Sequence, residues 1–304
     1  MLDRRTTARR VPAAVVLRDR AHPLTEETRV ADLADLTLND GHTLPAIGFG
    51  TYPLDDAQAR DAIVSAAEVG YRLVDSAVNY GNEAGVGAGV RDTGIREQLV
   101  VTTKVPGRDH GYDETLRSLD GSLDRLGLDR VDLYLIHWPN PSVDRYVDTW
   151  RAMIAARDAG KVRSIGVSNF TEAHLRRLVD ETGVLPAVNQ VEMHPYLPQA
   201  RLRAFHDEHG IVTEAWSPLG RRSDLLDNDT LAGLARDKGV SVTRLVLAWH
   251  RALGSVPLPK AASREHQAEN LDVAGIELTD DEVAAVSALE RGRIGGDPDH
   301  HEEM

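Results

Sequence analysis

One pattern repeats along most of the chain: a short apolar or β-branched run, then a longer segment with helical periodicity. The strand-like runs cover residues 46–51, 71–75, 99–104, 131–137, 162–168, 187–190, 211–216 and 255–260. The helix-like segments cover residues 56–69, 82–92, 113–126, 143–159, 171–182, 198–209, 228–238 with 242–252, and 264–271. Repeated strand–helix units of roughly 30 residues predict an α/β fold with a closed parallel sheet, the (β/α)8 or TIM barrel. A doubly wound open sheet is the alternative.

The segments on either side of this repeat have a different texture. Residues 36–46 read as a small N-terminal β-hairpin with Asp40-Gly41 at its turn, and we expect it to plug the bottom of the barrel. Residues 1–35 begin with an Arg-rich stretch and are expected to form a poorly ordered N-terminal extension, with a targeting role as the alternative. Residues 36–304 are therefore predicted to form a single barrel domain, and its polar C-terminal tail begins at about residue 283.

Charge and cysteine content narrow the classes of function. The net charge of −13 does not favour binding to nucleic acid or to an anionic membrane. The absence of cysteine excludes disulfides, thiolate catalysis and Cys-ligated metal sites. No apolar run approaches the ~20 residues that a membrane-spanning helix needs. We therefore expect a cytoplasmic, monomeric protein whose partner is a small molecule.

Hydrogen-bonding or stacking side chains stand where the predicted strands end. They are Asp75, Lys104, His137, Ser168-Asn169, Asn189-Gln190, Trp216-Ser217 and Lys260. Each alone has an ordinary structural explanation, such as a turn acid, a strand end reaching solvent or a core histidine. Active sites of this fold form at the C-terminal ends of the strands. Polar groups that converge on one mouth therefore predict an active site there.

Four of these residue types can be assembled into proton-transfer chemistry. A buried Lys104 needs a counter-charge, and Asp75 on the neighbouring strand can supply it. An ammonium near the phenol of Tyr80 is expected to lower its pKa, so that Tyr80 can act as a general acid. His137 can donate a hydrogen bond to a carbonyl oxygen. Because the chain offers no convincing nucleophile and no metal cluster, an organic cofactor must supply the electrons.

Several longer motifs carry a family resemblance. They are GFGTY (48–52), DSAVNYGNE (75–83), LYLIHWP (133–139), SIGVSNF (164–170), PAVNQVEMHP (186–195), AWSPLG (215–220), PLPK (257–260) and AEN (268–270). On these motifs, residues 36–295 resemble the aldo-keto reductases, and most of all their bacterial 2,5-diketo-D-gluconate reductase-like branch. The resemblance implies a (β/α)8 barrel that reduces an aldehyde or ketone to an alcohol with NADPH. It also implies a small dicarbonyl, a keto ester or a keto sugar acid as substrate.

The resemblance assigns roles residue by residue. Its catalytic tetrad is Asp75, Tyr80, Lys104 and His137. Its cofactor-binding residues are Ser168, Asn169, Gln190, Trp216, Ser217, Leu219, Gly220, Lys260, Arg264, His266, Glu269 and Asn270. Its substrate mouth is formed by Tyr52, Trp138 and His137 together with the C-terminal tail.

The sequence departs from the family pattern where the 2′-phosphate would bind. The family usually has Ser after the lysine of the last strand and Arg six residues beyond that lysine, whereas this chain has Ala261 and His266. Losing a hydroxyl and a permanent cation should weaken phosphate recognition, although Arg264 could offset part of the loss. We expect NADPH to be preferred and NADH to be usable. Asn79, next to the proton donor, also departs from the branch.

Other functions fit the sequence less well. The glycines of GVGAGV (85–90) and GFGTYP (48–53) lack both the third glycine and the strand–turn–helix context of a Rossmann dinucleotide motif. A metal-dependent hydrolase or glycosidase would need a metal cluster or paired carboxylates at the strand ends. The alternative that stays open is a catalytically weak NADP(H)-binding barrel with a regulatory role. No metal site is expected, and the terminal His300-His301-Glu302-Glu303 run reads as a solvated tail.

Overall fold

The computed structural model describes residues 33–304, so the predicted N-terminal extension lies outside it except for residues 33–35. The central sheet is wholly parallel, in the order β10-β9-β8-β7-β6-β5-β4-β3. Its strands are β3 (Phe49–Gly50), β4 (Leu73–Asp75), β5 (Val100–Val105), β6 (Val131–Ile136), β7 (Val162–Ser168), β8 (Val188–Glu192), β9 (Val212–Trp216) and β10 (Val256–Pro257). The amides of Gly48 and Gly50 donate to the carbonyls of Pro257 and Pro259 at 3.0 and 3.2 Å, which joins β3 to β10 and closes the barrel. The predicted (β/α)8 barrel is confirmed.

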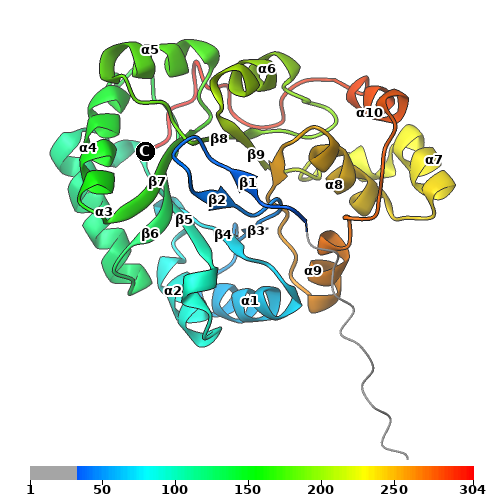
Figure 1. The fold of residues 1–304 in the computed structure, drawn as a ribbon, viewed down its shortest axis with the longest axis horizontal. Coiled ribbons are helices and arrows are strands. Elements are labelled where there is room, and N and C mark those ends of the chain that lie inside the picture. Colours follow the sequence, from blue (N-terminus) through cyan, green and yellow to red (C-terminus); the bar gives the residue numbers. More distant parts are fainter. Residues whose placement is uncertain (1–32) are drawn as a thin grey trace, which may run out of the picture.

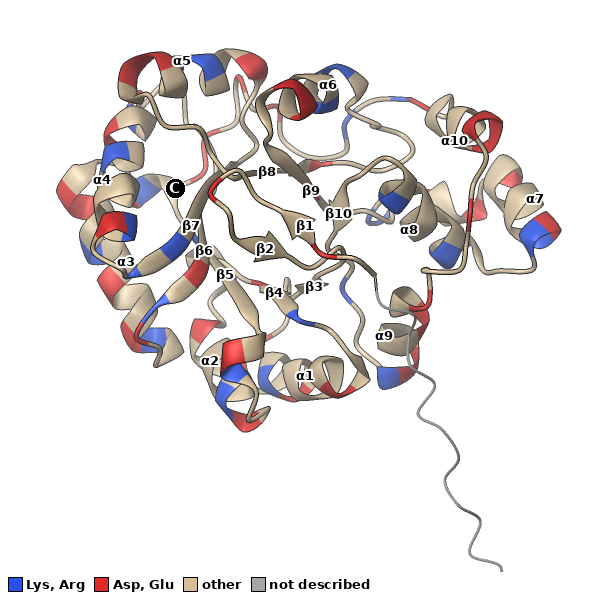
Figure 2. Cartoon of the chain, viewed as in Figure 1, with Lys and Arg blue, Asp and Glu red and all other residues tan. Residues whose placement is uncertain are grey.

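An outer ring of helices surrounds this sheet (Figure 1). The helices are α1 (Asp56–Val69), α2 (Glu83–Asp92), α3 (Tyr112–Leu126), α4 (Tyr146–Asp158), α5 (Glu172–Thr182), α6 (Ala200–His209), α7 (Asp229–Lys238), α8 (Val242–Ala252), α9 (Arg264–Leu271) and α10 (Asp280–Ser287). Short 3-10 turns cover Val78–Tyr80, Arg96–Gln98, Gly107–Asp109 and Leu225–Asp227. Charged residues lie mainly on the helices and loops, whereas the inner strands carry few (Figure 2). No helix within residues 33–304 is both long and apolar enough to cross a membrane.

A small antiparallel hairpin covers one end of the barrel, formed by β1 (Leu36–Thr37) and β2 (Thr43–Leu44). Leu38 and Leu44 are 4% and 0% exposed. Both pack in a cluster with leucines from the inside of the barrel, among them Leu73 and Leu133. Because these strands enter the barrel at this end, the hairpin closes the end opposite the predicted active site.

Local sequence signals explain where several elements begin and end. The Asp55 side chain accepts from the amide of Gln58, and the Gln58 side chain accepts from the Asp55 amide, which caps the first turn of α1 on both sides. Gly127 ends α3 in the left-handed region at φ 62°, where a residue without a Cβ is favoured.

The predicted element boundaries hold best for the long strands. β5, β6, β7 and β9 agree with their predicted spans to within one residue at each end. β8 continues past the predicted end at residue 190 to Glu192, and β10 is only two residues long because prolines interrupt the last strand-like run. α10 was not predicted, because its region read as part of the polar tail. Its signal was the capping box of Thr279 and Glu282.

Candidate active site

Lys104 lies at the centre of the polar cluster at the C-terminal ends of β4 and β5. Its ammonium is fully buried, and its Nζ donates to both carboxylate oxygens of Asp75 at 2.7 and 2.8 Å. It also donates to the carbonyl of Ser76 at 2.9 Å and to the phenol oxygen of Tyr80 at 3.2 Å. Burial lowers the pKa of Lys104, but the charges of Asp75 and Tyr80 and the hydrogen bonds to both together more than offset this, so the net pKa lies above its usual value. Lys104 therefore stays charged beside the phenol.

The loop that carries Tyr80 is held by Asn82, which is fully buried. The Asn82 side chain accepts from the hydroxyl of Ser76 at 2.9 Å and donates to the carbonyls of Thr51 at 3.3 Å and Leu54 at 3.0 Å. Tyr80 is the last residue of the short 3-10 turn between Ser76 and Asn82. The loop thus leaves β4 after Asp75 and returns the phenol over Lys104, as the sequence predicted.

The expected direction of the Tyr80 pKa shift is wrong. Burial raises the pKa of Tyr80 to about 12, because removing the phenol from water penalises its ionised form. Lys104 lowers the pKa as expected, through its charge and its hydrogen bond, but burial together with the charges of Asp75 and Glu303 raises it by more. The sequence identified the charge partner and could not weigh it against the desolvation.

His137 lies beside Tyr80, directly after β6. The two rings are edge-to-face with centroids 5.8 Å apart. Its backbone carbonyl accepts from the side chain of Asn169 at 3.0 Å, and Asn169 accepts in turn from the indole of Trp216 at 2.7 Å. Burial lowers the pKa of His137, and only the contact with Glu303 opposes this shift appreciably, so the imidazole is neutral at neutral pH. Residues from three strand ends are thereby brought to one mouth.

Glu214 on β9 belongs to this cluster and is not among the site residues predicted from the sequence. Gln190 is its register partner on β8, and Nε2 of Gln190 donates both to Glu214 and to Asp75, each at 2.8 Å. Burial, with the nearby charge of Asp75, raises the pKa of Glu214 to about 8. Glu214 is therefore largely protonated at neutral pH. An acid within the apolar run IVTEAW was the signal that could have identified it.

Comparison with known proteins places the chain in a family. Residues 46–291 match the family model for the aldo/keto reductase family. The chain belongs to this family. It is 59% identical over 275 residues to 2,5-diketo-D-gluconic acid reductase B of Corynebacterium sp. (strain SHS752001), which covers 90% of this chain and 99% of that protein. It is 44% identical over 265 residues to an aldo-keto reductase of Mycolicibacterium smegmatis, covering 86% and 96%.

Solved structures of aldo-keto reductases share the fold. The crystal structure of a mutant of Gox0644 in complex with NADPH matches with a TM-score of 0.85 and 39% identity, over 88% of this chain and 98% of that one. An aldo/keto reductase from Brucella melitensis matches with a TM-score of 0.82 and 43% identity, over 85% and 100%. This aldo-keto reductase is thus an NADP-dependent oxidoreductase, and NADPH is its cofactor.

The strand ends of this aldo-keto reductase fit a nicotinamide. Asn169 and Ser217, which follow β7 and β9, adopt left-handed backbone at φ 63° and 51°, a conformation that is uncommon for non-glycine residues. Trp216, which donates to Asn169, is only partly buried. Both N–H groups of the Gln190 amide are used, which leaves its oxygen to accept from a carboxamide. Ser168 donates to the backbone of Gln190 at 2.8 Å.

Only some of the residues predicted to bind the adenosine half of the cofactor lie close together. Lys260 and His266 are exposed near the N-terminus of α9, and no ion pair to either is found within residues 33–304. Arg264 instead pairs with Glu68 of α1, so the proposed compensation at the phosphate would require that pair to break. Among the remaining predicted residues, Leu219 is partly buried, Gly220 has φ 71°, Glu269 accepts from the Ser241 hydroxyl at 2.6 Å, and Asn270 is buried at 3% exposure.

The rim of the mouth is aromatic. Tyr52 is 52% exposed, and its ring centroid lies 5.2 Å from that of Tyr80. Trp138 is nearly buried and lies 6.5 Å from Trp216 and 4.2 Å from His301 of the tail, measured between ring centroids. The tail is anchored below His301 by Glu192, whose carboxylate accepts from the amides of residues 294 and 295 at 2.5 and 2.8 Å. Glu192 had no signal in the sequence, because it lies about a hundred residues before the backbone that it binds.

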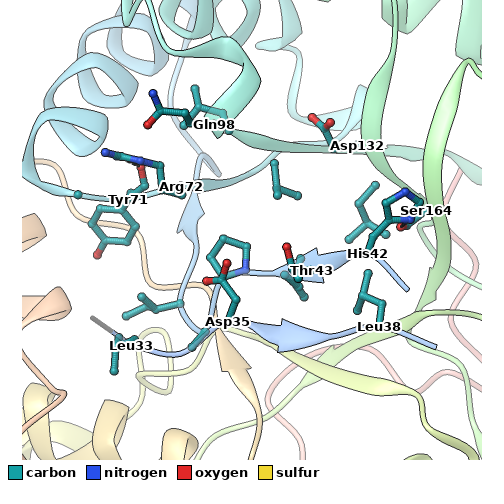
Figure 3. A pocket seen from close by; sticks show the side chains of 18 of the residues that line it. Leu33, Asp35, Leu38, His42, Thr43, Tyr71, Arg72, Gln98, Asp132 and Ser164 are labelled. Atoms are coloured by element: carbon teal, nitrogen blue, oxygen red, sulfur yellow. Dashed lines mark hydrogen bonds between the residues drawn. The ribbon is translucent and has the colours of Figure 1, made fainter. Parts of the chain in front are cut away.

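A large cavity lies at the opposite end of the barrel. It measures about 750 Å³ and lies between the hairpin and the residues at which β4 to β7 begin, including Arg72, Asp132 and Ser164 (Figure 3). Two of its polar groups have partners: Asp132 pairs with Arg96 at 2.8 Å, and Ser164 contacts His42 at 3.3 Å. The phenol oxygen of Tyr71 has no hydrogen-bond partner within the described residues. None of the predicted tetrad lines this cavity, so we place the active site at the polar mouth and not here.

Proposed function

We propose that this chain reduces a small aldehyde or ketone to an alcohol, with NADPH as the reductant and Tyr80 as the proton donor. The observation that carries the proposal is the fully buried ammonium of Lys104, bound by Asp75 and lying 3.2 Å from the Tyr80 oxygen. A buried charge is costly, and its pairing to a phenol at a ligand mouth suits proton transfer better than it suits stability.

The chain's own residues divide the work of proton transfer. A carbonyl oxygen between Tyr80 and His137 would receive a hydrogen bond from each. Tyr80 donates its proton to that oxygen, and Lys104 stabilises the phenolate that remains. Asp75 keeps Lys104 in place and offsets its charge. A neutral imidazole carries one N–H group, and Nδ1 of His137 faces the Glu303 carboxylate at 2.7 Å, so donation to the carbonyl oxygen requires the proton to lie on the other ring nitrogen.

NADPH supplies the hydride when it is bound. We propose that Ser168, Asn169 and the Gln190 oxygen hold its carboxamide and that Trp216 stacks on its ring. Ser217, Leu219 and Gly220 would line the pyrophosphate channel, and Lys260 with His266 would meet the 2′-phosphate. The missing hydroxyl at Ala261 and the imidazole at His266 support weaker phosphate recognition, so NADH would also be used.

The substrate class is proposed from the shape of the mouth and from the relatives. Tyr52, Trp138 and the tail would enclose a small dicarbonyl, a keto ester or a keto sugar acid. The name of the Corynebacterium relative, 2,5-diketo-D-gluconic acid reductase B, supports including the last of these. We also propose that the protein acts as a cytoplasmic monomer.

Replacement of Tyr80 by Phe tests this function. Tyr80→Phe removes the proton donor and leaves the ring, so kcat for methylglyoxal with NADPH should fall about a hundredfold to ten-thousandfold. The Kd for NADPH, followed by tryptophan fluorescence, should stay within about twofold, since the phenol is not in the proposed cofactor contacts.

The matched control is Tyr112→Phe, which removes an exposed phenol outside the site. It should leave both kcat and the NADPH Kd unchanged. Near-native turnover by Tyr80→Phe would refute the assigned role. Tight NADPH binding without turnover of any carbonyl by the wild-type protein would instead favour the regulatory barrel.

A further inference from the structure

The tail of the chain brings a carboxylate into the active-site mouth. Oε1 of Glu303 lies 2.7 Å from Nδ1 of His137 and accepts from the side chain of Asn79 at 2.7 Å. The Glu303 side chain is only 14% exposed. This carboxylate is therefore part of the mouth, although the tail read as solvated in the sequence.

The backbone of the tail holds Glu303 in this position. Asn140, fully buried after β6, donates to the Glu303 carbonyl and accepts from the Glu303 amide at 3.2 Å. The neighbouring Glu302 accepts from the amide of Ser142 at 3.0 Å. A Cβ at Gly107 would collide with the Glu303 carbonyl, so this position leaves room for the tail. Because these contacts do not depend on His137, they hold the Glu303 carboxylate at one side of the mouth.

The Glu303 carboxylate carries a negative charge. Burial alone would raise the pKa of Glu303, but the contacts with His137 and Asn79 lower it by more, so the carboxyl is ionised at neutral pH. His137 is neutral, and Lys104 is offset by Asp75. The guanidinium of Arg108 donates to the Asn79 oxygen and to the main-chain oxygen of Met304.

We propose that the Glu303 carboxylate selects substrates by their charge. It favours uncharged carbonyl compounds over those that carry a carboxylate next to the carbonyl. The inference rests on the proposed function, which places the carbonyl oxygen between Tyr80 and His137. The groups bonded to that carbon then lie near the Glu303 carboxylate, where a second negative charge is repelled. Among the proposed substrates, dicarbonyls and keto esters are favoured over keto sugar acids.

A pair of substrates that differ in charge tests the proposal. We compare kcat/KM for ethyl pyruvate and for pyruvate, with NADPH, in the wild-type protein and in Glu303→Gln. The variant keeps the size of the side chain and removes its charge, so the ratio of pyruvate to ethyl pyruvate efficiency should rise about three- to tenfold. The matched control is Glu302→Gln, which removes the same charge one residue away, and its ratio should equal that of the wild-type protein.

An unchanged ratio in Glu303→Gln would overturn the proposal, as would an equal rise in Glu302→Gln. A fall in the ratio would show that the Glu303 position serves acids instead. Binding gives an answer without turnover: benzoate and benzamide are titrated onto the NADPH complex and followed by tryptophan fluorescence. Benzamide should bind more tightly than benzoate in the wild-type protein, and the difference should narrow in Glu303→Gln. Loss of ethyl pyruvate turnover in Tyr80→Phe tests the proposed function separately.

Discussion

Glu214 offers a stability measurement that does not depend on substrate. Its carboxyl is fully buried, and one oxygen accepts from Gln190 while the other has no partner within the described residues. Burial, with the charge of Asp75, raises its pKa from 4.5 to about 8. Between these values the folded chain binds a proton that the unfolded chain has lost. The free energy of unfolding should therefore fall as pH rises through this window and level off above it.

The magnitude follows from the size of the shift. One pKa unit corresponds to about 1.4 kcal/mol. The ionisation of Glu214 should therefore lower the free energy of unfolding of the wild-type protein by about 4 kcal/mol between about pH 5 and about pH 8.5. Glu214→Gln keeps an oxygen for Gln190 and cannot ionise. Its free energy of unfolding should exceed that of the wild-type protein by this amount at the higher pH and by much less at the lower one.

Urea denaturation of both proteins at the two pH values measures this difference. Other titrating groups contribute equally to both proteins and cancel in the comparison. Glu290→Gln is the control, since it removes an exposed carboxylate and should leave the pH dependence as in the wild-type protein. If Glu214→Gln and the wild-type protein lost stability in parallel, Glu214 would be ionised at neutral pH and the reasoning would be refuted.

Two further predictions concern the cofactor. His266→Arg supplies a permanent cation near the N-terminus of α9, so it should tighten NADPH binding more than NADH binding in fluorescence titrations. Equal effects on both cofactors would contradict the placement of His266 at the phosphate. In Gly295→Ala, the added Cβ would collide with the Trp216 ring and with the Glu192 carboxylate, so NADPH binding should weaken. Gly275→Ala, where a Cβ meets nothing within 4 Å, should bind NADPH as the wild-type protein does, and equal Kd values for both variants would argue against stacking on Trp216.

The part of the site that lies at strand ends could be predicted from the sequence. The repeated alternation predicts a parallel barrel, and in a parallel barrel every strand ends on the same face. Asp75, Lys104 and His137 therefore had to meet there, whatever the lengths of the intervening helices. The place of Tyr80 could also be predicted, because Tyr80 comes only five residues after Asp75, where β4 ends.

The rest depends on information that local sequence patterns do not contain. Glu303 is separated from His137 by most of the chain, and its position is set by a loop contact with Asn140. Glu214 meets Gln190 because of strand register, and β9 is buried on both faces along most of its length, so no alternation marks its inward side. The sign of the Tyr80 pKa shift required the balance of burial against a charge, and only the structure gives the burial.

The two ends of the barrel differ in chemistry: one is apolar and stabilises the fold, and the other holds buried polar groups. At the closed end, Leu38 and Leu44 pack on apolar side chains, and burial of apolar surface stabilises the fold by about 25 cal/mol per Å². At the open end, Lys104 and Glu214 are buried polar groups whose desolvation opposes folding. A chain selected for stability alone would not keep both groups within one small cluster, where a well-packed apolar layer is often at least as stable. The polar mouth is therefore better explained by chemistry than by folding, and the apolar hairpin end contributes stability that such a mouth does not.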